Sequence, residues 1–149
     1  MITICIPGIP KPGGSKKSFP HSKTGKIVTI DACKMNKDWR NTVSIYAKQA
    51  YKEKPLSGPL KLKIVFLMPR PKNHYKKVKG FGTKLKDDAP LYHTIRPDIT
   101  KLIRSLEDAL TGIIWNDDAQ IVNQSSTKIY SNVPGVMVYV SIVKEEIHE

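Results

Sequence analysis

Five of the thirteen acidic residues of this chain lie between His93 and Val122, although the protein carries a large surplus of positive charge. They are Asp98, Glu107, Asp108, Asp117 and Asp118. A hard divalent cation such as Mg²⁺ binds one or two carboxylates together with water and phosphate oxygens. Such an ion can activate water and stabilise the leaving oxygen when a phosphodiester is hydrolysed. These carboxylates therefore suggest metal-dependent phosphodiester chemistry, while the alternative for two adjacent aspartates is an ordinary solvated turn.

The spacing limits which carboxylates can share one metal ion. Asp98 and Asp108 are ten residues apart, which is about 15 Å along a helix axis. That separation is too long for a shared ion. Asp118 can approach Asp98 if the strand after the helix runs back alongside it. We therefore expect Asp98 and Asp118 to converge at one site.

An amphipathic helix is expected to position these residues. Apolar side chains recur with helical spacing at Ile99, Leu102, Ile103, Leu106, Leu110 and Ile113. Pro97 disfavours helix in the residue before it, and Asp98 is a suitable first residue. Gly112 provides a natural end after Thr111. The pattern predicts a helix that begins near Asp98 and ends near Thr111.

The other elements follow from similar patterns along the chain. Strands are predicted at 2–6, 27–30, 60–68, 119–130 and 135–143, and a helix from an N-cap at Asp31 to Tyr51. The last two strands are expected to pair with each other through the turn at 131–134. The resulting order predicts one small α+β domain over 1–149, with two helices on a mixed or mainly antiparallel sheet.

Two basic segments, residues 11–26 and 70–96, are expected to be flexible loops. The second combines Lys and Arg with His74, Tyr75 and Phe81, a mixture that suits phosphate contacts and stacking on bases. Any one of these side chains could equally be a solvated residue without a specific role. We predict DNA contacts from Lys16, Lys17, Arg70, Lys72, Lys76, Lys77, Arg96, Lys101 and Lys128.

Composition narrows the class of partner. The 149 residues carry a net charge of +12, which favours nucleic acid over an anionic membrane as partner. There is no pattern of a signal peptide and no apolar run of about 20 residues, so we expect a cytoplasmic protein. Cys5, expected to be buried, and Cys33 are predicted to be free thiols, and neither a membrane nor a small-molecule cofactor is expected.

The run RPDITKLIRSLEDALTGIIWNDDAQIV resembles the RusA family of Holliday junction resolvases. Asp98 takes the first acidic position of the family pattern, and Arg104 takes its basic position. The helix signature is matched by 108–110, Asp-Ala-Leu. The closing motif is matched by Asp117, Asp118 and Gln120. A weaker similarity extends over the rest of the chain.

The resemblance implies a RusA-like fold and a homodimer that makes paired nicks in four-way DNA junctions with Mg²⁺ or Mn²⁺. It assigns Asp98 and Asp118 as catalytic, metal-binding carboxylates. Arg104 stands in place of a functional Lys, keeping the charge and the phosphate affinity but not the ability to donate a proton. The dimer interface is expected on the strand at 60–68 or on the last strand.

One departure from the family pattern affects the site. Thr100 stands where the family has a second acidic residue, so one anionic ligand is lost and Asp117 could replace it. His93 could serve as a proton shuttle or contact phosphate. The alternative function is a junction-binding protein with weakened or lost catalysis. A third possibility, an RNA-binding regulator, finds no RNA-recognition module in the sequence.

Overall fold

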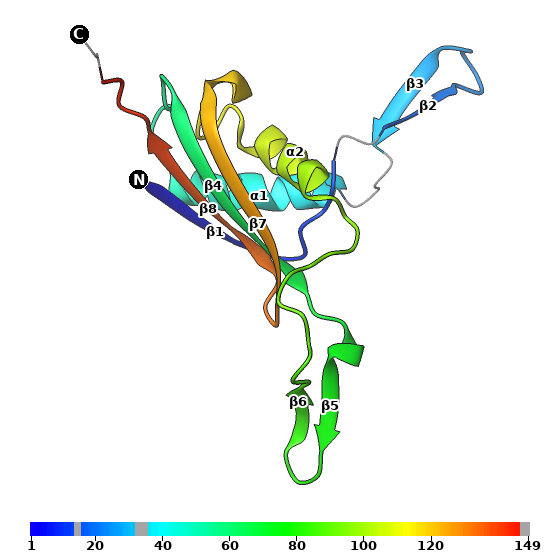
Figure 1. Ribbon diagram of the computed structural model, residues 1–149. Helices are drawn as coiled ribbons and strands as arrows, with labels where there is room; N and C mark the ends of the chain where they lie inside the picture. Colours follow the sequence, from blue (N-terminus) through cyan, green and yellow to red (C-terminus); the bar gives the residue numbers. More distant parts are fainter. Residues whose placement is uncertain (14–15, 32–35, 147–149) are drawn as a thin grey trace.

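The computed structural model describes residues 1–13, 16–31 and 36–146, excluding the side chains of residues 16–17 and 29–31. Its body is one mixed sheet with strand order β1-β8-β4-β7 (Figure 1). The strands are β1 (Ile2–Pro7), β4 (Leu60–Pro69), β7 (Ile121–Ser131) and β8 (Gly135–Ile142). With the two helices described below, this sheet confirms the predicted α+β class.

The prediction that the last two strands pair with each other is wrong. β4 lies between them, parallel to β7 and antiparallel to β8. Alternate residues of β4 are fully buried, from Leu60 to Phe66, so the most apolar strand takes the centre of the sheet. The polar sequence of β7 suits an edge strand, where one side of the backbone faces solvent.

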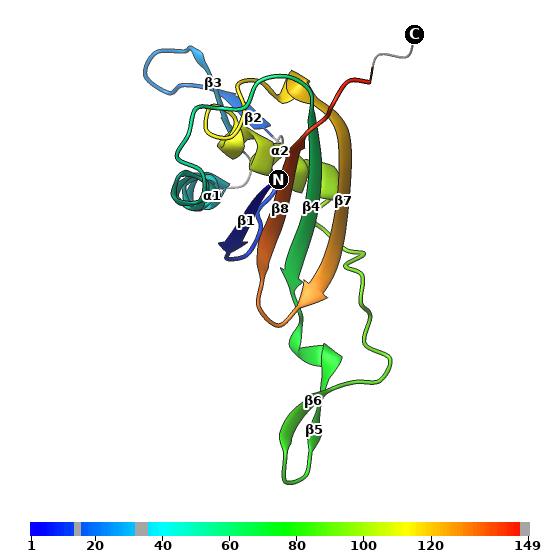
Figure 2. The ribbon, with the colours of Figure 1, turned by 90° about the vertical axis from the view of Figure 1, so that its left-hand side faces the viewer.

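Both helices cover the same face of the sheet (Figure 2). Helix α1 (Asn36–Ala50) buries Trp39 and Val43, and helix α2 (Ile99–Leu110) buries Leu102 and Leu106 against the sheet. The predicted bounds of α2 are confirmed, including Gly112 with a positive φ of 86° just after its end. Helix α1 begins at Asn36, whereas the predicted N-cap at Asp31 would place its first residue at position 32.

The start of α1 was misplaced because Asp31 is the last residue of β3 (Ile27–Asp31) and is therefore not a helix cap. β3 pairs with β2 (Lys16–Pro20). The next basic segment likewise contains η1 (Lys72–His74) and a hairpin of β5 (Tyr75–Val78) and β6 (Gly82–Leu85). Both hairpins project from the body (Figure 1). The expected loops thus contain regular structure, and their flexibility stays a prediction.

Among the described residues, no helix covers the opposite face of the sheet. β4 and β8 contribute Val65, Leu67, Met137 and Tyr139 to it, all of them partly exposed. Cys5 is a free, exposed thiol rather than a buried one, because its neighbours Ile4 and Ile6 take the core side of β1. Cys33 lies outside the described residues.

Within the described ranges, no helix has both the length and the apolar character needed to span a bilayer.

Candidate active site

A groove of about 890 Å³ lies at the N-terminal end of α2. Its walls come from the chain after β1, the end of β4, the segment before α2 and Tyr130 of β7. The charged and imidazole side chains that line it are Lys11, Arg70, His93, Arg96, Asp98 and Lys101. The segment Ile9–Pro12 also lines it, and sequence reasoning did not connect that segment with a site. The groove therefore holds one carboxylate among several cationic side chains.

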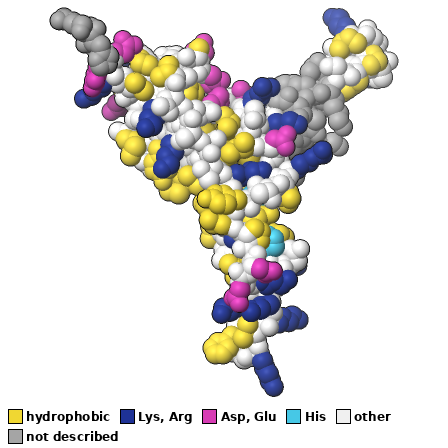
Figure 3. All heavy atoms as spheres, viewed as in Figure 1, with side chains coloured by type: hydrophobic (Ala, Val, Ile, Leu, Met, Phe, Trp, Pro, Cys, Tyr) yellow, Lys and Arg dark blue, Asp and Glu magenta, His cyan; other side chains and the backbone are white. Residues whose placement is uncertain are grey.

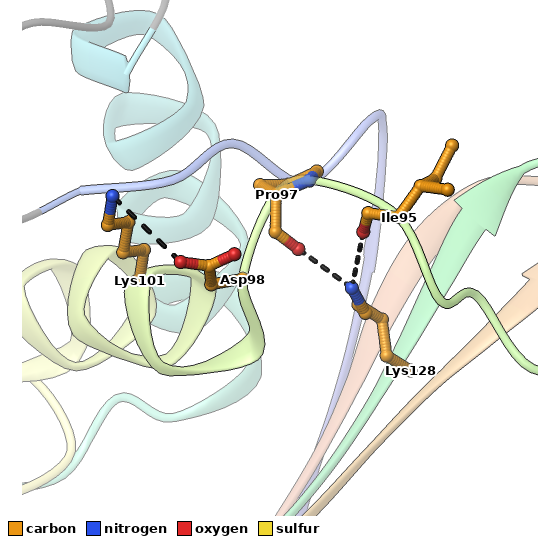
Figure 4. A network of polar contacts seen from close by, with 5 residues as sticks. All are labelled: Ile95, Pro97, Asp98, Lys101 and Lys128. Atoms are coloured by element: carbon orange, nitrogen blue, oxygen red, sulfur yellow. Dashed lines mark hydrogen bonds and ion pairs between the residues drawn. The ribbon is translucent and has the colours of Figure 1, made fainter.

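Asp98 occupies the N-cap position of α2, but its carboxylate accepts no capping hydrogen bond. The backbone provides the start of the helix instead, since the Leu102 N–H donates to the Asp98 carbonyl at 3.1 Å. Lys101 Nζ lies 4.0 Å from Asp98 Oδ2, and both side chains are largely exposed (Figure 4). An ion pair of this kind contributes little stability. The Asp98 carboxylate is therefore free to bind a cation.

Lys128 fixes the segment that leads into Asp98. Its Nζ donates to the carbonyls of Ile95 at 2.7 Å and Pro97 at 2.8 Å (Figure 4). Burial lowers the pKa of Lys128, and the negative charge of Asp98 acts in the opposite direction. Lys128 was predicted to contact DNA, but its observed contacts are those of a residue that positions Asp98.

Tyr130 organises the other wall of the groove. Its ring makes edge contacts with the rings of His74 and His93, with both centroid distances at 4.9 Å. The Arg70 guanidinium lies 5.1 Å from the Tyr130 ring centroid, and Arg70 Nη1 donates to the Pro90 carbonyl at 2.7 Å. These contacts hold a guanidinium group at the groove while leaving several of its five N–H donors free.

His93, suggested from the sequence as a proton shuttle or phosphate contact, is buried, with 6% of its surface exposed. Its Nδ1 is buried without a hydrogen-bond partner. Burial lowers the pKa of His93, and the positive charge of Lys128 lowers it further, while a backbone hydrogen bond has the opposite effect. The lowered pKa favours the neutral imidazole of His93 in the wall of the groove.

Asp118 lies at the other end of α2. Its Oδ1 accepts hydrogen bonds from Thr111 Oγ1 at 2.5 Å and from Trp115 Nε1 at 2.9 Å. Thr111 follows the last residue of the helix and Asp98 precedes the first, so a helix of 12 residues, about 18 Å long, separates the two carboxylates.

The expected convergence of Asp98 and Asp118 is therefore not formed within one chain. β7 does run back beside α2, as the prediction required. However, because β7 runs back towards the start of α2, its later residues lie nearer to that end. Lys128 therefore reaches the segment before Asp98, whereas Asp118, which precedes β7, lies beside the end of α2.

Glu107 is the carboxylate that the fold brings near Asp118, and sequence reasoning did not select it. Burial raises the pKa of Glu107, and the negative charge of Asp118 raises it further. Gln124 of β7 donates a hydrogen bond to Glu107 Oε1. No sequence signal marks this group, because it depends on the placement of β7 beside α2.

The closing Asp-Asp-Ala-Gln motif builds a turn. Asp117 Oδ1 accepts from the Ala119 N–H at 2.8 Å and caps η2 (Asp118–Gln120). Gln120 Oε1 accepts from the Asn116 N–H at 2.8 Å, and its Nε2 donates to the Leu56 carbonyl at 2.9 Å. The Asp117 side chain, expected as a substitute metal ligand, is thus used in this cap at the far end of α2 from the groove.

The remaining predicted residues lie outside the groove. Arg104 is exposed on α2, Lys72 lies in η1, and Lys76 and Lys77 lie on β5. Lys16 and Lys17 lie on β2, and their side chains are outside the described part. Among the described residues, no three His, Cys, Asp or Glu side chains are grouped closely enough to hold a metal ion.

Comparison with known proteins agrees with the motif and the fold. The family model of the endodeoxyribonuclease RusA matches residues 7–141. The chain is also 30% identical over 120 residues to the uncharacterized protein YqaN of Bacillus subtilis (strain 168), a match that covers 79% of this chain and 81% of that protein. The chain therefore belongs to the RusA family of Holliday junction endodeoxyribonucleases.

Proposed function

We propose that the groove at the start of α2 is where this endodeoxyribonuclease binds the phosphodiester that it cleaves in a four-way DNA junction. The observation that carries the proposal is Asp98: an exposed carboxylate without a capping role, in a groove otherwise lined by cationic side chains. Cationic walls attract the DNA backbone. A carboxylate in such a place repels phosphate unless a cation stands between them.

Three cationic groups are suited to hold the DNA backbone there. Arg70 is held in place by Tyr130 and Pro90, and Arg96 and Lys101 line the same groove. Lys101 is paired with Asp98 only at 4.0 Å, so a phosphate oxygen can replace that contact at little cost. His93 lines the groove and its lowered pKa favours the neutral form, so it is the group there best suited to accept a proton from the attacking water.

Asp98 would hold the divalent cation, Mg²⁺ or Mn²⁺. Such an ion needs at least one protein carboxylate, and phosphate oxygens and water complete its coordination. Asp98 supplies that carboxylate. When bound, the ion supplies charge stabilisation at the phosphate and a more acidic water. In this arrangement Asp98 orients the ion, the basic residues orient the DNA, and Lys128 keeps Asp98 in position.

Asp118 enters this scheme through a second subunit. Within one chain the length of α2 separates it from Asp98, and only one of its oxygens accepts the hydrogen bonds from Thr111 and Trp115. The other oxygen can bind a cation. A homodimer in which the partner subunit's Asp118 faces Asp98 would supply the second carboxylate that a metal site of this kind commonly uses.

The outer face of the sheet is a second surface on which two copies could pair. Pairing there would keep the two α2 helices on opposite sides of two stacked sheets, however, and would not bring the partner subunit's Asp118 to Asp98. A sheet is normally covered on its apolar face by another layer, and here the side opposite the helices carries Val65, Leu67, Met137 and Tyr139 without one. The two strands expected to form the interface, β4 and β8, are neighbours and both contribute to this face.

A labelled synthetic four-way junction tests the function directly. Wild-type protein with Mg²⁺ should nick the junction in pairs, and EDTA should abolish the nicks. Asp98→Asn should reduce cleavage at least about a hundredfold, because several kcal/mol of charge stabilisation are lost. The matched control is Glu53→Gln, an exposed carboxylate that lies beside Gly112 at the other end of α2, which should cleave normally. Equal loss in both variants contradicts the assignment.

Thr100 favours a second candidate function. Because Thr occupies the position of a family carboxylate, the groove holds one acidic side chain and catalysis can be weak or absent. The protein would then bind junctions without resolving them. Tight junction binding with no cleavage in Mg²⁺ or Mn²⁺ identifies this case, and restored cleavage in Thr100→Asp would assign the loss to the missing ligand.

A further inference from the structure

We propose that the β5–β6 hairpin is a wedge that places Phe81 against the unstacked base pairs at the branch point of the junction. This inference rests on the proposed function, since it concerns how the same substrate is recognised. The hairpin stands away from the sheet and helices in both ribbon views (Figures 1 and 2). In sequence it lies between Arg70 and Asp98, so both of its ends lead to residues that line the groove.

The hairpin is strongly basic. Residues 75–86 contain five lysines and no acidic residue, and Lys and Arg side chains gather over this arm in Figure 3. The lysines, all exposed, are Lys76, Lys77, Lys79, Lys84 and Lys86. A two-stranded hairpin of this kind has no apolar core of its own. Its surface is therefore suited to lie between two DNA backbones.

Two of these lysines face each other across the strands. Lys76 is paired directly with Lys84, an arrangement in which like charges repel. Asp87 offers Lys76 only an exposed ion pair at 4.0 Å, which offsets little of the repulsion. A phosphate group between the two ammonium groups would relieve it. The pair thus indicates an anionic backbone as the partner along the strands.

The tip of the hairpin presents an aromatic ring rather than another charge. Phe81 is 85% exposed and is the most exposed aromatic side chain among the described residues. It sits between Gly80 and Gly82, whose φ angles of 83° and 81° are left-handed and close the turn. The Phe81 N–H donates to the Val78 carbonyl at 3.1 Å, which fixes the backbone of the tip.

A branch point offers what such a tip needs. Along a duplex arm the bases are stacked and closed to a phenyl ring, whereas at the crossover the stack ends and an apolar base face is open. Aromatic side chains stack on bases without requiring a given sequence. Lysines along the strands and a ring at the tip therefore suit the combination of backbone and open base face that distinguishes a junction from a duplex.

The root of the hairpin ties the tip to the groove. The Lys86 N–H donates to the His74 carbonyl at 2.9 Å, and the Tyr75 hydroxyl donates to the side chain of Asn132 in the β7–β8 turn. His74 also contacts Tyr130, the residue that holds Arg70. The position of Phe81 is thereby linked to that of the groups proposed to bind the scissile phosphate.

The test compares wild-type full-length protein with Phe81→Ala and Phe81→Trp on a four-way junction that carries 2-aminopurine at the branch point. A second junction carries the same probe in the middle of one arm, and a plain duplex measures general DNA affinity. EDTA in all binding assays prevents cleavage. Tyr46→Ala, a partly exposed aromatic residue of α1, is the matched control.

We expect wild type to change the fluorescence of the branch-point probe and not that of the arm probe. Phe81→Ala should lose this change and reduce the ratio of junction to duplex affinity about tenfold, the loss of one stacking contact. Phe81→Trp should retain both. The salt dependence should be unaltered in Phe81→Ala, whereas Lys84→Ala should reduce its slope by about one.

Three outcomes overturn the inference, and each is distinct. If wild type prefers junctions and Phe81→Ala behaves identically, the wedge is wrong while the proposed function stands. If wild type binds junction and duplex equally, the proposed function fails as well. If Phe81→Ala loses binding only to vesicles of phosphatidylserine and phosphatidylcholine, the hairpin serves an anionic membrane instead.

Discussion

The two ends of α2 carry the two carboxylates that the family motif singles out, and their surroundings differ. At the start of the helix, Asp98 is exposed, makes no capping bond and faces a cation-lined groove. At the end, Asp118 accepts hydrogen bonds from Thr111 and the buried Trp115 and lies beside a second carboxylate, Glu107. Asp98 can therefore bind a ligand, whereas Asp118 already has hydrogen-bond partners within the chain.

This difference separates two uses of the same residue type. A carboxylate with few internal contacts can be replaced with little effect on folding but with a large effect on a bound cation. A carboxylate that satisfies a buried indole N–H contributes to stability whatever else it does. The four predictions below test whether the ends of α2 differ in this way, beginning with the largest expected effect.

Mixing two inactive variants tests whether the ends act together across subunits. Asp98→Asn and Asp118→Asn, co-expressed with different tags, should form heterodimers in about half of the dimers. If one site uses Asp98 of one subunit and Asp118 of the other, each heterodimer retains one intact site. We expect it to nick one strand of the junction, whereas each homodimer is inactive. The measurement is strand cleavage by purified heterodimer.

A heterodimer that remains inactive contradicts the shared site. An active Asp118→Asn homodimer contradicts it as well, because Asp98 would then act with phosphate and water alone and Asp118 would be a structural residue. Glu53→Gln paired with either variant provides the control, because such a heterodimer keeps one site with both Asp98 and Asp118.

The free energy of unfolding should depend on Asp118 and hardly on Asp98, the opposite of the effect on a bound cation. Asp118→Ala leaves the indole N–H of the fully buried Trp115 with only Thr111 as a partner, at 3.2 Å. We expect a loss of about 1–3 kcal/mol in the free energy of unfolding. Asp98→Ala should change it by less than about 0.5 kcal/mol, as at an ordinary surface position. Denaturant unfolding of both variants provides the values, and equal losses would remove the distinction.

Lys128 is expected to act through position rather than through direct contact with DNA. Lys128→Met removes the hydrogen bonds to the carbonyls of Ile95 and Pro97. We expect about 1–2 kcal/mol of destabilisation and slower cleavage. Junction affinity and its salt dependence should hardly change, because a true phosphate contact would alter the salt slope. Partial recovery of cleavage in Lys128→Arg would support positioning, and an altered salt slope would contradict it.

The smallest effect is a pH dependence at the far end of α2. Because burial and Asp118 raise the pKa of Glu107, the folded state holds its proton more tightly than the unfolded state. Its contribution to stability is therefore complete below the unfolded pKa and is lost as pH rises through the folded pKa. Wild type should therefore lose stability relative to Glu107→Gln as the pH rises above about 4.5, the ordinary pKa of a glutamate. Thermal unfolding at several pH values measures this, and parallel curves would refute it.

The local sequence pattern was sufficient to predict α2 and the presence of five strands of the sheet or of a hairpin. Apolar spacing, Asp98 at the start and Gly112 after the end act within a few residues, so they predicted the bounds of α2. The start of α1 failed because Asp31, a good cap in isolation, pairs in a hairpin with β2. The pairing of the last two strands failed because β4 competes for both, and that competition involves residues about sixty positions away.

The sequence by itself determined the family motif, the excess of positive charge, the α+β class and the helix that carries the acidic residues. Only the tertiary structure decided that Asp98 shares a groove with His93 and Arg70. It also decided that Lys128 binds the segment before Asp98, and that Glu107 rather than Asp98 lies near Asp118. The physical reason is the reach of the interactions. Helix signals act over one or two turns, whereas the neighbours of a side chain depend on how β7 and β4 align, which the burial of the whole core decides.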